Sequence, residues 1–487
     1  MLNIPWWLSL RKKYIDNLSV NIIWGLISNL LQNVLFSAFF IVIARKYNSQ
    51  DFASYILSNT LYGMLLAFSS LGLGQWFIRT YMTIEDQLNL VYTFLKMQVL
   101  VGFIFYGFNI VLAYFLYKDP LIRNLSFIIG INIVFDNIIY VVKYVNIARY
   151  EQKKTFLILT IEAFIKCMIA CLLFISPIPI LYLSFILIVL RLLSLHLFLQ
   201  YGTNVPIKIL RIFDTPVSLK VIRAIIEENF FFIIIGSISV IYWKLGNLFI
   251  SKFLTLKEVA IYEISFKFFS IAEVLPTIAS TTVFPLLVTL YADKNRKDHS
   301  YFHRSFWYYA GFGLFAYTFI YCYSDFILPF LFTDKYTIAV KYCNQMFLTI
   351  LIFPTALLQA NLLIALQLEK IDMWLNVTSL LFNVLFSVIA LYFFKDLSYV
   401  NYAVFFSFLL FHAAQDYFLI KKNIYDFKHC LKFYAVSVAT VLFFHLTSLF
   451  VNKYVLFVFF WALLLGLLIY LSLFKRRRVL SALPVTS

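Results

Sequence analysis

The chain has 487 residues, of which 63% are hydrophobic and 13% are charged, and its mean hydropathy is +0.88. This composition excludes a water-soluble globular protein, because the polar residues are too few to cover the surface of one. The net charge of +17 does not indicate a nucleic-acid partner, because in a membrane protein Lys and Arg mainly report which loops lie on which side. We therefore expect an all-α integral membrane protein.

The predicted elements of the first half begin with a basic triplet, Arg11 to Lys13, and a long apolar run that we interpret as a retained first helix rather than a signal peptide. The apolar segments of this half are 18–44, 52–74, 88–117, 121–146, 155–175 and 178–200. They predict an N-terminal lobe of about six transmembrane helices over residues 1–203. Residues 204–223 contain Pro206, Pro216 and four basic residues, and they predict an amphipathic connector on the cytoplasmic surface.

The second half continues with a similar series of apolar segments. They are 224–250, 257–291, 303–332, 340–367, 371–394 and 397–420, followed by 430–450 and 454–474. We expect a second six-helix lobe over 224–422, and two further helices with a basic cytoplasmic tail over 423–487. The total is about fourteen spans, with about twelve as the alternative.

Basic residues concentrate on alternate loops of this series, including the loops around 143–154, 208–223, 294–304 and 421–432. By the positive-inside rule these loops are cytoplasmic, which also places both termini on the cytoplasmic side. A short internal similarity supports two parallel repeats, because Arg45, Asp51 and Tyr55 align with Lys252, Glu258 and Tyr262. The expected location is the cytoplasmic membrane of a bacterium.

Polar side chains recur every three or four residues in several predicted spans, which places them along one face of each helix. Charges in such positions usually face a hydrated cavity, and the alternative interpretation is a set of hydrogen bonds that hold the helices together. The candidate cavity residues are Asn21, Gln32, Asp136, Lys143, Lys166, Lys244, Glu263, Lys267, Glu273, Asn376 and Asn383.

Two of these cations have a carboxylate one helical turn away, so Glu162–Lys166 and Glu263–Lys267 are predicted internal ion pairs. Lys244 has no such neighbour, and an anionic group of a substrate is its expected partner. No nucleotide-binding loop, zinc-protease motif or hydrolase motif occurs, and the cysteines form no CxxC pair. We expect no enzyme activity, no metal site and no cofactor, apart from a coupling ion, H⁺ or Na⁺.

Two segments resemble one known family. Ile43 to Arg79, IARKYNSQDFASYILSNTLYGMLLAFSSLGLGQWFIR, and Asn247 to Phe268, NLFISKFLTLKEVAIYEISFKF, resemble the repeat-unit flippases for O-antigen, capsule and teichuronic polysaccharides. These belong to the multidrug/oligosaccharidyl-lipid/polysaccharide exporter superfamily. Members commonly carry an acidic residue where Asn247 stands, so the resemblance does not extend a proton-coupling role to that position.

The resemblance implies two lobes around a central cavity that opens alternately to the two sides of the membrane. It implies a polyprenyl-pyrophosphate-linked oligosaccharide as cargo, with membrane lipids, a polysaccharide polymerase and glycosyltransferases as partners. Lys143, Lys166, Lys244 and Lys267 would attract the anionic headgroup. One alternative is a cation-coupled multidrug exporter, which needs a buried carboxylate such as Asp136, Glu263 or Glu273.

A second alternative is a membrane polysaccharide polymerase or glycosyltransferase. Such an enzyme needs an essential charged residue in an outer loop, for which Asp51, Glu258 and Asp334 are the candidates. These acidic residues are scattered singly over short outer loops, which argues against this class.

Overall fold

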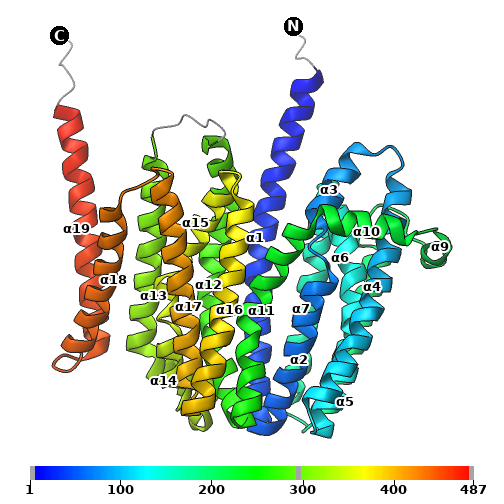
Figure 1. Cartoon of the computed structure of the whole chain (residues 1–487), viewed down its shortest axis with the longest axis horizontal. Coiled ribbons are helices and arrows are strands. Elements are labelled where there is room, and N and C mark those ends of the chain that lie inside the picture. The colour runs from blue at the N-terminus through cyan, green and yellow to red at the C-terminus, as the bar shows by residue number, and fades with distance from the viewer. Residues whose placement is uncertain (1–5, 292–297, 482–487) are drawn as a thin grey trace.

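The helices stand side by side in two groups, with the first helix between them (Figure 1). The computed structural model describes residues 6–291 and 298–481, with the backbone alone up to Ile23, and these residues contain helices and no strand. This confirms the expected all-α, multi-pass membrane fold. We call the end of the bundle where the first helix begins and the last one finishes the terminal end, and the opposite end the distal end.

The N-terminal lobe contains every helix up to Gln200. Its helices are α1 (Trp6–Lys46), α2 (Ser49–Ser69), α3 (Gly74–Thr83), α4 (Gln87–Leu116), α5 (Pro120–Gly130), α6 (Asn132–Ala148), α7 (Gln152–Leu172) and α8 (Ile180–Gln200). The connector residues then form α9 (Ile209–Asp214) and α10 (Leu219–Glu228), which lie across the terminal end (Figure 1). Ile212 and Ile225 are buried beneath the connector, whereas Arg211 and Arg223 are exposed. The connector is therefore amphipathic.

The C-terminal lobe follows the connector. Its elements are α11 (Phe230–Phe253), α12 (Leu256–Tyr291), α13 (Ser300–Phe332), η1 (Asp334–Tyr336), α14 (Ala339–Met346), η2 (Thr349–Leu351), α15 (Phe353–Ala365), α16 (Glu369–Phe394) and α17 (Ser398–Lys421). Two more helices, α18 (Phe427–Thr447) and α19 (Lys453–Ser481), complete the described chain.

The predicted spans each coincide with a helical segment, and in the described part of the chain 11 of these segments are long and apolar enough to cross a membrane. The other three spans coincide with α2, α11 and α19, which are 21, 24 and 29 residues long. Two spans are interrupted. Ile131 separates α5 from α6, and η2 separates α14 from α15. The short helix α3 was not predicted, because it is too short to produce a span-length apolar run.

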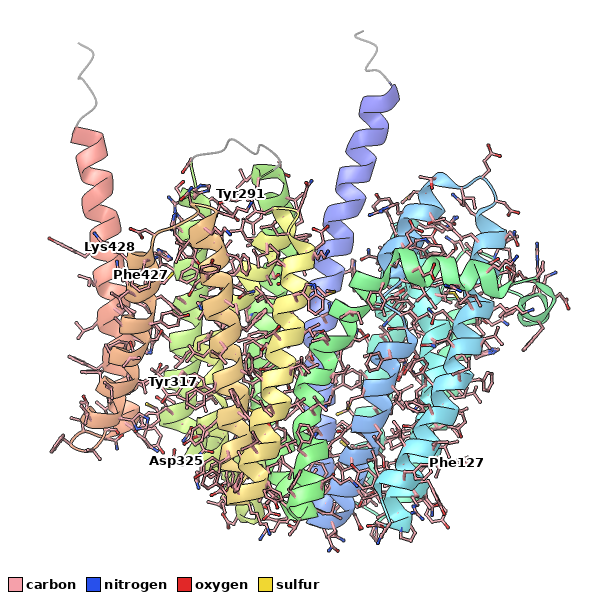
Figure 2. The ribbon with its side chains drawn as sticks, viewed as in Figure 1. Phe127, Tyr291, Tyr317, Asp325, Phe427 and Lys428 are labelled. Carbon is pink, nitrogen blue, oxygen red and sulfur yellow. The ribbon has the colours of Figure 1, made fainter. Side chains whose placement is uncertain are left out.

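The last two helices are attached to α13. Lys453 forms an ion pair of 2.5 Å with Asp325, Trp461 donates a hydrogen bond of 3.0 Å to Thr318, and Tyr317 lies 3.1 Å from His445. Figure 2 labels Tyr317 and Asp325 on the side of α13 that faces these helices. The C-terminal pair therefore packs on the C-terminal lobe and away from the N-terminal one.

The two lobes meet at the distal end through an aromatic core. Phe40 of α1 contacts Phe332 edge to face at 6.1 Å, and Phe52 of α2 contacts Tyr336 at 6.4 Å between ring centroids. Towards the terminal end α1 instead packs on α7 of its own lobe, where Ser28 and Thr160 hydroxyls are 2.8 Å apart. The helix α1 thus changes partner along its length.

Three basic side chains close the same end by donating hydrogen bonds to main-chain carbonyls of the opposite lobe. Arg45 reaches the carbonyl of Phe330 at 3.5 Å, Lys252 reaches that of Leu116, and Lys335 reaches those of Ala44 and Tyr47. Arg45 and Lys252 are aligned positions of the internal similarity, and each contacts the last turn of the equivalent helix of the other lobe. We call these three residues the distal clasps.

The aligned acidic residues Asp51 and Glu258 make similar hydrogen bonds at the starts of α2 and α12. The Asp51 backbone N–H donates a hydrogen bond of 2.8 Å to the side-chain oxygen of Asn48, the N-cap of α2, and the Asp51 carboxylate accepts one from the Asn48 amide. Glu258 accepts a bond from the Thr255 backbone at 3.1 Å before α12. Carboxylates favour the first turn of a helix because they complement its positive end. Both repeats therefore begin their second helix with the same local chemistry.

Candidate functional site

A polar cavity of about 380 Å³ lies inside the N-terminal lobe. Five of its helices, α1, α2, α6, α7 and α8, contribute polar side chains to it. The polar lining residues are Gln32, Tyr55, Asn59, Tyr62, Asn132, Lys143, Glu162, Lys166, Ser184 and Arg191. A second cavity of about 300 Å³ shares Lys143 and Leu159 with it and extends past Gln152 towards the terminal end. We call the pair the N-lobe cavity.

A network of ion pairs forms one wall of this cavity. The Arg191 guanidinium donates hydrogen bonds to Asp136, at 2.7 Å from its Nε, and to Glu162, at 2.5 Å from its Nη1. Lys166 lies 2.6 Å from the other oxygen of Glu162, and Tyr62 donates a hydrogen bond to Asp136. Asp136 and Glu162 are 8% and 2% exposed, so their charges must be compensated by these cations.

Lys143 stands apart from this network. Among the described residues no carboxylate oxygen lies within ion-pair distance of its ammonium group, although the side chain lines both parts of the cavity. Three cations, Lys143, Lys166 and Arg191, line the N-lobe cavity, and they are balanced by Glu162 in the lining and by Asp136 behind it, which leaves an excess of one positive charge. The buried Oδ1 of Asn132, on the same helix, also has no hydrogen-bond partner in the described chain. A cavity of this kind favours an anionic, hydroxyl-rich ligand.

A second charged group lies where α2 meets α11 and α12. Lys244 lies 3.3 Å from Glu263, whose other oxygen accepts a bond of 2.6 Å from Asn247. Asn247 also reaches Thr60 of the opposite lobe at 3.2 Å, and it is fully buried. This corrects two expectations, because Lys244 does have a carboxylate partner and Glu263 pairs with Lys244 rather than with Lys267. The partner lies on a different helix, so spacing along one helix could not reveal it.

The remaining candidates fall in other places. Lys267 lies over the Phe40 ring at 5.8 Å, and Glu273 is further along α12. Asn376 donates to Asp372 of its own helix at 2.8 Å and borders a separate cavity of about 140 Å³. Asn383 accepts a bond of 3.1 Å from Ser387. The side chain of Asn21 lies outside the described residues.

The predicted residues therefore do not share one cavity. Gln32, Lys143 and Lys166 line the N-lobe cavity, beside Asp136, whereas Lys244, Glu263 and Lys267 lie at the boundary between the lobes. The predicted Glu162–Lys166 ion pair is confirmed at 2.6 Å.

Sequence reasoning missed Arg191 and Tyr62 as site residues. Arg191 does carry a signal, because it is a single charge near the middle of an otherwise apolar span, and such residues usually face a protein interior. Tyr62 carries no such signal, since nothing in the sequence distinguishes it from the other tyrosines of a chain that contains 33.

A family model described as polysaccharide biosynthesis protein matches residues 42–341, which is more than half of the chain. The chain belongs to this family. The polysaccharide biosynthesis model spans α2 to η1 completely, and so it includes the Lys244–Glu263 pair, the distal clasps and the lining of the N-lobe cavity apart from the residues of α1. No curated protein sequence matches this family member significantly.

Solved structures of related folds support the architecture of this polysaccharide biosynthesis protein. The lipid II flippase MurJ, in an inward closed conformation, superposes with a TM-score of 0.69 at 13% identity, covering 94% of this chain and 100% of that one. An inward-facing multidrug resistance MATE transporter of the MOP superfamily gives 0.66 at 9% identity, covering 80% and 95%. A MOP superfamily transporter from Pyrococcus furiosus gives 0.57 at 11% identity, covering 85% and 96%. These likenesses show that the chain shares the fold of these transporters.

Proposed function

We propose that this polysaccharide biosynthesis protein is a flippase. Its cargo is a polyprenyl-pyrophosphate-linked oligosaccharide repeat unit, which it carries from the cytoplasmic to the outer leaflet of a bacterial cytoplasmic membrane by alternating access. The observation that carries the proposal is the N-lobe cavity, which has an uncompensated lysine, Lys143, among amide and hydroxyl groups. The family match supports a role in polysaccharide biosynthesis.

The physical task of such a protein is to lower the cost of moving a polar headgroup through hydrocarbon, where charges and unpaired hydroxyls are strongly unfavourable. Lys143 and Lys166 would hold the pyrophosphate or acidic sugars, and Gln32, Asn59 and Asn132 would exchange hydrogen bonds with sugar hydroxyls. The polyprenyl chain stays in the bilayer. No chemical step on the substrate is needed.

The orientation follows from the basic connector. Lys208, Arg211, Lys220 and Arg223 are exposed at the terminal end, which supports a cytoplasmic position for that end. The distal clasps close the other end, and the N-lobe cavity extends towards the terminal end. This arrangement supports a state that receives cargo from the cytoplasmic side.

The alternatives receive less support. A multidrug exporter needs a carboxylate that is free to meet a cationic drug, but Asp136 is held by Arg191 and Glu263 by Lys244 and Asn247. Glu273, whose buried Oε2 has no hydrogen-bond partner among the described residues, is the candidate that this alternative keeps. A polymerase or glycosyltransferase needs a reactive outer carboxylate, but the carboxylates of Asp51 and Glu258 accept hydrogen bonds from Asn48 and Thr255 at the starts of α2 and α12.

The leaflet position of lipid-linked repeat units in cells that lack the protein tests the proposal, using an impermeant lectin on oriented vesicles. Wild type should relieve accumulation on the cytoplasmic leaflet. Lys143→Ala should flip about tenfold more slowly, because it loses a charged contact with the cargo, and Lys143→Arg should keep most of the activity. Lys118→Ala, at an exposed lysine of the distal end, is the matched control.

Two results would contradict the proposal. Repeat units that reach the outer leaflet normally without the protein would exclude a flippase. If Lys143→Ala were as fast as Lys118→Ala while a Lys244→Ala, Lys267→Ala double variant failed, the cargo site would lie between the lobes instead of in the N-lobe cavity.

A further inference from the structure

An apolar groove of about 480 Å³ lies between α16 and α17, two neighbouring helices of the C-terminal lobe (Figure 1). Residues 386–394 and 399–410 contribute its lining, and we call it the α16–α17 groove. Its deepest side chains are alanines, because Ala403 is 4% exposed and Ala390 is half-buried, whereas Phe394 is 60% exposed. Small residues on both helices thus leave a hollow between larger ones. The proposed transport mechanism does not use this groove.

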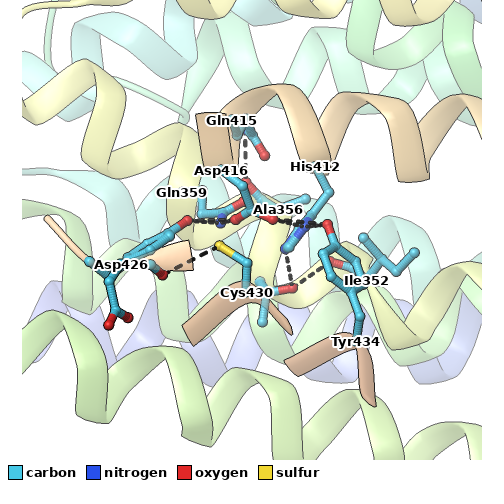
Figure 3. Close-up of polar contacts among 11 residues, drawn as sticks. Ile352, Ala356, Gln359, His412, Gln415, Asp416, Asp426, Cys430 and Tyr434 are labelled. Carbon is cyan, nitrogen blue, oxygen red and sulfur yellow. Dashed lines mark hydrogen bonds and ion pairs between the residues drawn. The ribbon is translucent and has the colours of Figure 1, made fainter. Parts of the chain in front are cut away.

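The helix α17 is fixed on the face opposite to the groove by buried hydrogen bonds (Figure 3). His412 is nine positions after Ala403, which is two and a half helical turns and places the two residues on opposite faces. The His412 ring lies 3.0 Å from the Thr355 hydroxyl, and Asp416 accepts a bond of 2.6 Å from Gln359. A shift of α17 into the groove would leave these buried groups without partners, which is costly. The groove therefore keeps its shape.

The groove opens towards the hydrocarbon of the membrane. Both helices are long and apolar enough to cross a bilayer. The lining side chains contain no polar group apart from two tyrosine hydroxyls, and several of them, such as Ile389, Phe406 and Leu410, are about half exposed. An outward-facing apolar surface of a membrane-spanning helix contacts lipid rather than water. The occupant is therefore a hydrocarbon chain.

The length of the groove matches one leaflet. On α17 it extends from Tyr399, in the first turn, to Leu410, a distance of about 16 Å at about 1.5 Å per residue. Half of the hydrocarbon core of a bilayer is about 15 Å thick. The groove thus spans the leaflet at the distal end and can hold one acyl chain of a glycerophospholipid. A polyprenyl chain is longer and would extend beyond it.

A lysine lies at the distal rim of the groove. Lys395 directly follows Phe394, is exposed, and forms no ion pair in the described part of the chain. It ends α16 in a left-handed conformation with φ of 49°. The next residue, Asp396, accepts a hydrogen bond of 2.7 Å from the Ser398 backbone and interacts electrostatically with Lys341. Since Lys341 is balanced by Asp396, Lys395 remains as the cation that can meet a phosphate group.

We propose that the α16–α17 groove binds one anionic glycerophospholipid of the distal leaflet, with an acyl chain against Ala390 and Ala403 and the phosphate at Lys395. Such a lipid would stabilise the C-terminal lobe, because a ligand that binds only the folded state raises its stability. The inference goes beyond the proposed flippase function and does not depend on it, since the argument uses only the groove, its length and its charge.

Native mass spectrometry of the full-length protein in detergent micelles tests the headgroup, because it counts the lipids that stay bound. We expect phosphatidylglycerol to bind about fivefold more tightly than phosphatidylcholine, which is the contribution of about one lysine near an anionic lipid. Lys395→Asn should abolish this preference, and asparagine tolerates the left-handed backbone at this position. Lys118→Asn, at an exposed lysine elsewhere at the distal end, should keep it. Equal affinities for the two lipids in wild type would overturn the proposal.

A second pair of variants tests the position of the acyl chain. Ala390→Phe fills the groove and should abolish phosphatidylglycerol binding at concentrations that saturate wild type. Ala439→Phe, on the exposed surface of α18, is the matched control and should bind as wild type does. Thermal unfolding without lipid checks that the variants fold, and Ala390→Leu is a milder filling variant of the same groove.

Three results would overturn this assignment. Equal binding by the folded Ala390 variants and Ala439→Phe would place the lipid elsewhere. Displacement of phosphatidylglycerol by an equal concentration of polyprenyl phosphate would assign the groove to a polyprenyl lipid. A wild-type dimer that Ala390→Phe abolishes would assign it to an interface between two copies of the chain. None of these measurements uses transport, so a failure of the flippase function would leave the lipid site standing.

Discussion

At the scale of single residues, Arg191 is the side chain on which the N-lobe cavity depends most. It joins α8 to α6 through Asp136 and to α7 through Glu162, and both carboxylates are buried while Arg191 itself is partly exposed to the cavity. Removal of one partner from a buried ion pair is costly because the other charge stays behind without compensation. The cation thus holds the cavity wall together, and Lys143 remains available for a ligand.

Arg191→Leu should destabilise the protein by about 3–5 kcal/mol, because two buried carboxylates would share only Lys166. Arg191→Lys should recover part of this loss, since an ammonium group cannot reproduce the planar, two-sided contact of a guanidinium. Thermal unfolding in nanodiscs measures the effect. Arg79→Ala, at an exposed arginine, is the control. Equal midpoints for Arg191→Leu and Arg79→Ala would show that the network is not structural.

Sequence patterns predicted which charged residues lie in this region better than they predicted which of those residues form ion pairs with one another. The Glu162–Lys166 pair follows from spacing along one helix, and it is present. The partners of Lys244 and Arg191 lie on other helices, and their approach depends on helix packing, which helical periodicity does not describe. Candidate residues could therefore be selected from the sequence, but they could not be sorted into the N-lobe cavity and the lobe boundary.

At the scale of elements, hydropathy predicted the transmembrane segments because a span needs a long apolar run. It did not predict the breaks inside two of them. The run 340–367 is continuous in hydropathy, yet the chain forms α14, η2 and α15 there. This irregular backbone packs on α13 at Gly313, where an added Cβ would come within 2.7 Å of the Ile350 carbonyl and 3.1 Å of the Leu351 carbonyl.

Gly313→Ala should therefore destabilise the C-terminal lobe by about 1–3 kcal/mol, because backbone atoms cannot move aside as a flexible side chain can. Gly311→Ala on the same helix is a matched control, since its added Cβ meets nothing within 4 Å. It should be neutral or slightly stabilising, as alanine favours a helix. Thermal midpoints of the two variants give the comparison. If Gly313→Ala proved as stable as Gly311→Ala, α13 and η2 would not be in close contact.

At the scale of the whole molecule, the distal clasps and the aromatic core beneath them hold the two lobes together at one end. The aligned positions Arg45 and Lys252 act in equivalent ways on opposite lobes. In the proposed alternating-access mechanism, opening of the distal end breaks all of these contacts together. Their loss should therefore shift the population towards a state that is open at the distal end.

A triple variant, Arg45→Ala, Lys252→Ala and Lys335→Ala, tests this. Spin labels at Lys118→Cys and Lys395→Cys, both exposed at the distal end, report the separation of the lobes by electron spin resonance. The triple variant should shift the distance distribution to longer values. Lys257→Ala, an exposed lysine at the same end, should leave it unchanged. A distribution that is identical in the triple variant and wild type would show that the clasps do not hold the lobes closed.

The acceptors of the distal clasps are main-chain oxygens, which every amino acid supplies. The residues at Leu116, Phe330 and Ala44 can therefore change during evolution while Lys252, Arg45 and Lys335 keep their hydrogen bonds. Correlated substitutions between the two lobes should be weak at this closure, even among distant relatives. Selection would instead preserve only the basic residue of each clasp. The two lobes could therefore diverge in sequence and still keep the hydrogen bonds that hold the distal end closed.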